Sequence, residues 1–249
     1  MESSARSTPP TSAALLAAWE TGASEAFVDR ASSLLRSLGA VPHDVAVGGL
    51  TVGQCDARLF RLRRAIFGDL LEAVATCPAC GEEVEFELSL AELQPDEIEG
   101  EVPLGTVAAD GFEVDYRVPL NEDLRSIAAL GEEADAGDLL ERCLLDARSP
   151  DGTPALAHEL PAATADSVLA AMADRDPGAR VELQVCCLCG DRWVDELDIR
   201  VIVWTDLTDW VGRTLTEVQQ LAMAYGWSEA DILAMAPWRR RWYLEVVGA

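Results

Sequence analysis

Apolar residues recur at helical spacing near the beginning of the chain, where two helices are predicted. A short pattern covers residues 13–20, and a clearer one covers residues 24–38, in which apolar side chains follow an i, i+3, i+4, i+7 order. Gly39 follows the second pattern, and glycine in this place is typical of a helix C-terminus. The N-terminal part of the chain is therefore predicted to be helical.

The clearest predicted helix begins at Thr51. Thr51 and Gln54 have the spacing of a capping box, and Gly68 ends the apolar stripe of this helix. The opposite face carries four arginines, Arg58, Arg61, Arg63 and Arg64. Such a face indicates either solvated arginines that pair with acidic residues elsewhere in the chain or a docking patch for a partner.

Two later segments alternate apolar and polar residues around a cysteine motif. Residues 70–90 contain Cys77-Pro-Ala-Cys80-Gly81, and residues 181–198 contain Cys186-Cys187-Leu188-Cys189-Gly190. Alternation with a period of two predicts strands on each side of a tight turn, which the glycine closes with a positive φ. Strand, cysteine turn and strand form one half of a zinc ribbon. The sequence thus predicts a ribbon split into two halves.

The residues between these halves have a pattern of their own. Asp110-Gly111 separates two short alternating runs, which predicts a β-hairpin with a primed turn. Three helices are predicted after it: one from Asn121 to Leu130 with Asn121 as its cap, one marked by Leu139, Leu140, Cys143 and Leu144, and one that Pro161 opens. We therefore expect an insertion that contains both strands and helices.

Residues 199–249 return to helical spacing. A long apolar stripe ends at Gly226, Ser228 caps a short helix, and Pro237 begins a final one. Six of the seven tryptophans lie between residues 193 and 242, which predicts a small aromatic core among these helices. One cluster near the C-terminus is interpreted as an interface and not as part of this core, because Trp and Arg anchor many protein interfaces. Its members, which we predict to form an interface, are Trp238, Arg239, Arg240, Arg241 and Trp242.

These patterns together predict an α+β protein. Its centre is a split four-cysteine zinc ribbon of small antiparallel strands with an acidic α/β insertion, flanked by N- and C-terminal helices. The predicted segments are a disordered tail (1–12), an N-terminal helical segment (13–69), the first ribbon half (70–90), the insertion (91–180), the second ribbon half (181–198) and a C-terminal helical segment (199–249).

Negative charge is concentrated in the middle of the chain. The formal net charge is -25, and residues 81–200 contain 30 Asp or Glu against 8 Arg. Binding to nucleic acid or to anionic lipid depends on Lys and Arg that displace counterions from phosphates. We therefore expect neither nucleic acid nor a membrane surface as a partner.

Neither a membrane span nor a secretion signal is predicted. The sequence lacks an apolar run of about 18 residues, and residues 1–12 are polar and lack the apolar core of a signal peptide. We expect a soluble cytoplasmic protein with reduced thiols.

The paired cysteine turns predict a structural metal site. The predicted ligands are Cys77, Cys80, Cys186 and Cys189. Four thiolates saturate the tetrahedron of one Zn²⁺ per chain and leave no position for water or substrate. Cys187 either packs in the interior or replaces one ligand, and Cys55 and Cys143 are expected to be small buried apolar residues. Two alternatives stay open: a redox-active dithiol and a metal-free cluster of cysteines.

No catalytic arrangement is evident in the sequence. His43 and His158 are the two histidines, both lie in predicted loops, and no nucleotide-binding, metalloprotease or serine-hydrolase motif occurs. We therefore expect no enzymatic activity.

Four segments of the chain have a familiar order. They are LLAAWETG (15–22), IFGDLLEAVATCPACGEEVEFEL (66–88), CCLCGDRWVDELDI (186–199) and EVQQLAMAYGWSEADILAMAPWRRRWYLEVV (217–247). In this order the chain resembles the bacterial and phage family of T-even-type baseplate hub assembly chaperones. The two cysteine motifs and the C-terminal segment are the most specific parts of the resemblance, and residues 91–180 are the least specific.

The resemblance implies a baseplate or hub protein of a contractile tail or an extracellular contractile injection system. Its partners would be baseplate, hub, spike or tube proteins, met in the cytoplasm of the producing bacterium, and the protein either leaves after assembly or stays in the particle. Within the family's pattern the metal ligands correspond to Cys77, Cys80, Cys186 and Cys189, although the second motif reads Cys-Cys-Leu-Cys where Cys-Pro-x-Cys is usual. Two other functions remain as alternatives: a zinc-ribbon adaptor for nucleic acid or the transcription machinery, and a thiol oxidoreductase.

Overall fold

The computed structural model describes residues 10–95, 100–131 and 134–248. Residues 1–9 of the predicted disordered tail (1–12) fall outside these ranges, whereas Thr11 caps the first helix and Ser12 begins it.

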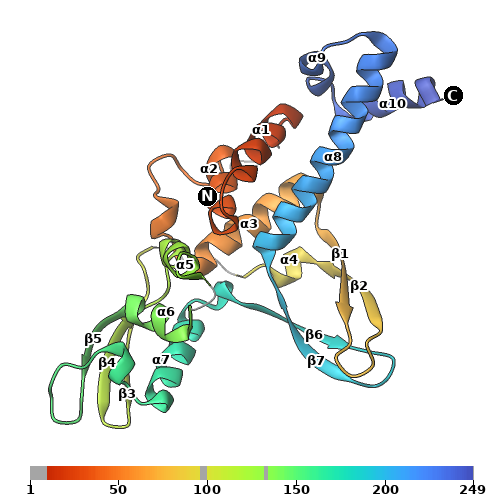
Figure 1. The fold of residues 1–249 in the computed structure, drawn as a ribbon. Coiled ribbons are helices and arrows are strands. Elements are labelled where there is room, and N and C mark those ends of the chain that lie inside the picture. Colours follow the sequence, from red (N-terminus) through yellow and green to blue (C-terminus); the bar gives the residue numbers. More distant parts are fainter. Residues whose placement is uncertain (1–9, 96–99, 132–133, 249) are drawn as a thin grey trace, which may run out of the picture.

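The centre of the molecule is a bundle of helices, here called the helical body (Figure 1). It consists of α1 (Ser12–Ala23), α2 (Phe27–Ser37), α3 (Val52–Phe67) and the first half of α8 (Ile199–Tyr225). Its core contains leucines from all four helices, among them Leu16, Leu35, Leu59 and Leu207. Burial of each such side chain stabilises the fold by about 1.5–3 kcal/mol. The apolar stripes in the sequence therefore correspond to one common core.

Helix α3 begins and ends as predicted. The Gln54 N–H donates to the Thr51 hydroxyl at 3.1 Å, and the Thr51 N–H donates to the Gln54 side-chain oxygen at 3.0 Å, which completes the capping box. Gly68 follows the helix with a φ of 94°, a conformation that favours glycine. The chain then turns directly into the first strand.

Two β-hairpins extend from the helical body and converge at their tips (Figure 1). Strands β1 (Leu70–Thr76) and β2 (Glu83–Ser89) form the first, and β6 (Val181–Cys186) and β7 (Arg192–Leu197) form the second. Each hairpin is an antiparallel two-stranded sheet of its own. The short helix α4 (Leu90–Leu93) follows β2, and β7 leads into α8. Both predicted strand, turn and strand segments are thus present.

The insertion between the hairpins has a separate core. Strands β3 (Leu104–Ala109), β4 (Phe112–Arg117) and β5 (Leu144–Arg148) form a sheet in this order, with α5 (Asn121–Ala128), α6 (Ala136–Cys143) and α7 (Ala162–Arg175) around it. Buried side chains from the sheet and from α6 and α7 pack together, among them Val114, Tyr116, Leu140 and Met172. The predicted primed turn is confirmed, because Asp110 and Gly111 have φ values of 52° and 82°.

Two details of the insertion differ from the sequence prediction. Leu144 begins β5 and does not continue α6. The apolar residues run from the helix into the strand without a break, so the pattern in the sequence did not mark this boundary. Asn121 is the first residue of α5 and not its cap: the Asp123 carboxylate accepts the N–H of Leu120 at 2.8 Å, and the Asn121 amide donates to Ser32 at 2.7 Å.

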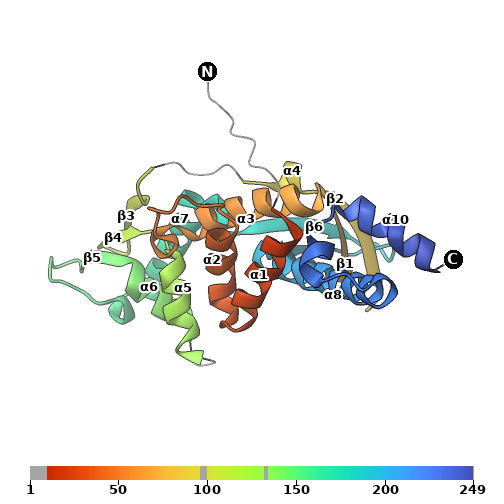
Figure 2. The same ribbon diagram turned by 90° about the horizontal axis from the view of Figure 1, so that it is seen from above.

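The C-terminal arm, residues 214–248, projects from the helical body on the side opposite to the insertion (Figures 1 and 2). It contains the end of α8, α9 (Glu229–Leu233) and α10 (Pro237–Gly248). Gly226 ends α8 in the left-handed conformation and Ser228 caps α9, both as predicted. Within the part of the chain that the structure describes, no helix combines the length and apolarity needed to cross a bilayer.

Candidate metal centre

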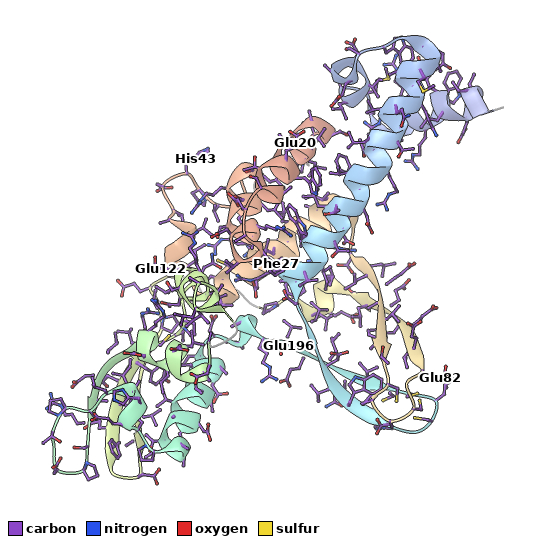
Figure 3. The ribbon with its side chains drawn as sticks, viewed as in Figure 1. Glu20, Phe27, His43, Glu82, Glu122 and Glu196 are labelled. Carbon is purple, nitrogen blue, oxygen red and sulfur yellow. The ribbon has the colours of Figure 1, made fainter. Side chains whose placement is uncertain are left out.

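Four cysteines meet where the two hairpins converge. Cys77 and Cys80 come from the tip of the β1–β2 hairpin, and Cys187 and Cys189 come from the tip of the β6–β7 hairpin. Their sulfur atoms all lie within 4.8 Å of one another, with 3.7 Å between the Cys77 and Cys189 Sγ atoms and 3.6 Å between those of Cys80 and Cys187. Figure 3 shows sulfur atoms gathered at these tips beside Glu82.

The spacing of the sulfur atoms fits a tetrahedral metal ion. A zinc ion with four thiolates at about 2.3 Å places each pair of sulfurs about 3.8 Å apart, whereas a disulfide requires about 2.05 Å. All four cysteines are free thiols. Since a tetrahedron of four protein ligands is complete, the site is suited to a structural ion and leaves no position for a substrate.

The two turns are closed by the same backbone hydrogen bond although they differ in length. Thr76 pairs with Glu83 and Cys186 pairs with Arg192, so that residues 77–82 form the first turn and residues 187–191 form the second. In both turns the first residue is a cysteine whose N–H donates to the last carbonyl, at 2.9 Å for Cys77 and at 3.0 Å for Cys187.

The other cysteine of each turn precedes a glycine with positive φ. This glycine is Gly81 in the first turn and Gly190 in the second, with φ values of 75° and 96°. The second turn is shorter by one residue, so its cysteines have the spacing Cys-x-Cys.

The ligand set in the structure therefore differs from the sequence prediction at one position. Cys186 is the last residue of β6, is exposed and lies outside the group of four sulfurs, whereas Cys187 lies inside it. Successive side chains of a strand point to opposite faces, and Val185 already occupies the buried face of β6. The Cys-x-x-C pattern pointed to Cys186 and not to Cys187 because a pattern of residue types does not report where the strand ends.

Backbone N–H groups of the first turn favour the thiolate form of Cys77. Burial raises the pKa of the Cys77 thiol, but the N–H groups of Cys80 and Ala79 donate to its sulfur, and its pKa lies below the ordinary value. At Cys80 the N–H of Glu82 favours the thiolate, yet the neighbouring thiols of Cys77 and Cys187 raise the pKa of Cys80 to about 12. Four thiols this close cannot all lose their protons unless a cation is present, and a divalent metal ion supplies that charge.

The two remaining cysteines are buried, as predicted. Desolvation raises the pKa of Cys55 in α3 to about 12 and that of Cys143 in α6 to about 11. Both thiols therefore stay neutral and act as small apolar side chains.

The arginines of α3 have different environments. Arg63 is buried and donates to the Asp206 carboxylate of α8 at 2.8 Å and to the carbonyls of Gly68 and Leu70 at 2.7 Å each. These contacts hold α3, α8 and β1 together, so the structure gives Arg63 a role within the chain and not at the predicted interface.

The other three arginines of α3 also make contacts within the chain. Arg64 pairs with Asp69 at 2.7 Å, and Arg58 and Arg61 donate to the carbonyls of Gln54 and Ala57 in α3 itself.

The arginines and tryptophans of α10 divide in the same way. Arg240 is buried, pairs with Glu217 of α8 at 2.9 Å and donates to Ser12 at 3.1 Å, so it attaches α10 to the rest of the molecule and does not face solvent. Trp238 and Trp242 are exposed, as are Arg239 and Arg241.

Sequence reasoning missed a network of buried and partly buried polar residues where the insertion joins the helical body. Arg200 of α8 donates to Asp56 of α3 at 2.6 Å and to Asn121 of α5 at 2.8 Å. Desolvation raises the pKa of Asp56 to about 6, although Arg200 opposes this shift. Single charged residues on predicted helices carry no sequence signal that would distinguish this network from a solvated surface.

Both histidines lie on the surface, as expected. His43 is exposed in the loop after α2, where Figure 3 labels it, and His158 is exposed in a short 3₁₀ turn.

Comparison with known protein families gives a match over most of the chain. A protein-family model described as T4 bacteriophage base plate protein matches residues 12–198. The matched range contains α1 to α7 and both hairpins, and it ends at Asp198, the N-cap residue of α8. No curated protein and no solved structure shows a significant match to the chain.

Proposed function

Because this chain belongs to the T4 bacteriophage base plate protein family, we propose that it is a zinc-stabilised structural or assembly protein of the baseplate or hub of a contractile particle. It acts through contacts with other proteins, and its partners are baseplate, hub, spike or tube components. It meets them in the cytoplasm of the producing bacterium and is incorporated into the assembled particle.

The grouping of four sulfur atoms is the observation that supports the zinc site. Two-stranded hairpins are marginally stable by themselves, and a metal ion shared between the two tips would hold both hairpins in one arrangement. Zinc–thiolate sites of this kind contribute about 10–16 kcal/mol of apparent binding free energy. The ion thus acts on the structure and not on a substrate, which agrees with the expectation of a protein without enzymatic activity.

The charge of the chain supports proteins as partners. The net charge of -25 opposes binding to nucleic acid, whose affinity comes largely from cationic side chains. Exposed tryptophans next to exposed arginines, as on α10, are typical of protein interfaces.

Affinity purification from the native host tests this function. The tagged chain is expected to recover sheath, tube, spike or baseplate proteins, and an unrelated tagged protein of similar negative charge serves as the control. Recovery of none of these components would contradict the proposal. Recovery of nucleic acid or of transcription proteins would favour the adaptor alternative, and disulfide exchange by the purified chain would favour the oxidoreductase.

A further inference from the structure

The outer face of α10 carries an apolar stripe. Trp238, Trp242 and Val246 are 68%, 56% and 53% exposed and follow one another at i, i+4 and i+8, so they lie along one side of the helix. Arg239 and Arg241 lie next to this stripe and are exposed. The combination has the form of a helix that inserts into the groove of a partner.

This stripe is not needed to attach α10 to its own chain. The neighbouring side of the helix already packs through Tyr243, whose ring contacts those of Tyr225 and Trp227 with centroid distances of 5.7 Å and 4.9 Å and also meets the Trp242 ring edge-on at 5.1 Å. The buried Arg240 adds its ion pair with Glu217. The helix is therefore held firmly on one side and presents a second apolar face to solvent.

A groove with complementary properties lies between the two hairpins and the beginning of α8. Its volume is about 280 Å³. Its apolar lining includes Leu71, Phe86, Leu183, Val201 and Ile202.

The rim of this groove is acidic. Asp195, Glu196 and Asp198 line it, and all three are exposed. Glu196 pairs with Arg180 at 3.3 Å, whereas among the described residues no cation lies within ion-pair distance of Asp195 or Asp198. The Asp198 carboxylate caps α8 by accepting the N–H groups of Arg200 and Val201, and the rim as a whole stays acidic. An apolar lining with an acidic rim suits an aromatic helix flanked by arginines.

The stripe and the groove of one chain cannot meet each other. Val201 and Ile202 lie in the first turn of α8, and α10 packs at the other end of this helix (Figure 1). Arg240 of α10 pairs with Glu217 of α8. At 1.5 Å per residue, the 16 residues from Val201 to Glu217 separate the two surfaces by about 24 Å. Any contact between them is therefore intermolecular.

We propose that α10 of one copy docks into the groove between the hairpins of a second copy. Trp238 and Trp242 would fill the apolar lining, and Arg239 and Arg241 would face Asp195 and Asp198. The contact joins two different surfaces, so it is repeated head to tail and produces a ring if the rotation closes. The inference rests on the proposed function, because it names one partner for a protein that acts through protein contacts.

Sedimentation and light scattering of the purified metal-bound chain test the proposal. The average mass is expected to rise with protein concentration. Replacing both tryptophans (Trp238→Ala with Trp242→Ala) is expected to weaken association by at least about tenfold, the loss typical of interface hot spots. A groove variant (Asp195→Arg with Val201→Arg) should weaken it equally. Leu156→Asp, at a residue that is 60% exposed on the insertion, is the matched control and should associate like the wild type.

A mixture of the two variants gives the sharpest result. The tryptophan variant keeps its groove and the groove variant keeps its helix, so the mixture should form a one-to-one dimer that cannot extend, whereas each variant alone stays monomeric. Circular dichroism and metal content confirm that both variants are folded.

Three results would overturn the inference. They are a wild-type chain that stays monomeric at every concentration, a groove variant that still associates, and a mixture that forms no dimer. None of these results affects the recovery of baseplate components from the host, so the proposed function is tested separately.

Discussion

At the end of β6, one position decides which thiol can reach the other hairpin. Cys186 still belongs to the strand and is paired with Arg192, whereas Cys187 is the first residue of the turn and lies within 3.6 Å of Cys80, sulfur to sulfur. The two neighbouring cysteines have the same chemistry. Only the length of the turn decides which of the two thiols joins the group of four sulfurs.

Replacing these two cysteines one at a time tests the ligand set. Cys187→Ser is expected to lose zinc, with affinity lowered by more than about 100-fold, since even the loss of an outer-shell partner costs 10–100-fold. Cys186→Ser is the matched control and should keep one zinc per chain. Metal analysis after gel filtration, together with thermal unfolding, measures both effects. Retention of zinc by the first variant and loss by the second would restore the set predicted from the sequence.

The two hairpins are elements that depend on each other. Leu71 and Leu88 of the first and Leu183 and Leu197 of the second pack against the core of the helical body at their bases. The tips lie far from that core, and each sheet has only two strands. Since two-stranded sheets have little stability of their own, the order of the tips is expected to come from the metal.

Removal of the metal is expected to loosen the hairpins before the helices. After treatment with a strong chelator, hydrogen exchange measured by mass spectrometry should increase in residues 70–90 and 181–198. Peptides from α1, α2 and α3 should keep their protection, because their contacts lie within the helical body. Readdition of zinc should reverse the change. Equal protection of the hairpins with and without metal would contradict a structural ion.

The insertion and the helical body are two cores joined by polar contacts. Gly53 at the start of α3 donates its N–H to Asp176 at 2.9 Å, and a Cβ at this glycine would lie only 2.8 Å from the carboxyl carbon of Asp176. Arg200 adds its bonds to Asp56 and Asn121 on the same side. The joint between the two cores therefore depends on buried charges and on one close backbone approach.

Stability is expected to depend on pH through Asp56. Its pKa is about 6 in the folded chain against 3.8 for an ordinary aspartate, because burial disfavours the carboxylate. The folded state thus binds this proton more tightly than the unfolded state does. Protonation of Asp56 therefore stabilises the fold, and this contribution is fully present below pH 3.8 and is lost as the pH rises through about 6. The difference of about two pH units corresponds to about 3 kcal/mol.

Asp56→Asn is expected to remove this dependence. Relative to the variant, the wild-type free energy of unfolding should fall by about 2 kcal/mol between pH 4 and pH 7, as measured by urea denaturation. Asp44→Asn, at an exposed residue, is the control and should follow the wild-type curve. Parallel curves for the wild type and Asp56→Asn would show that Asp56 does not titrate in this range.

Local patterns in the sequence determined most of the elements of this protein. The capping box of Thr51 and Gln54, the primed turn at Asp110-Gly111 and the glycines that end α3 and α8 all act over a few residues, so their residue types were sufficient to predict them. The α+β class and the two strand, turn and strand segments followed from the same periodicities.

Only the tertiary structure decided which side chains are available for function. Arg63 and Arg240 resemble their exposed neighbours in sequence, but each finds an acidic partner on α8, at Asp206 and Glu217. The choice of Cys187 over Cys186 likewise depends on a second hairpin more than 100 positions away in the chain. Burial and pairing are set by segments distant in sequence, and the pattern around a single residue does not record where those segments will lie.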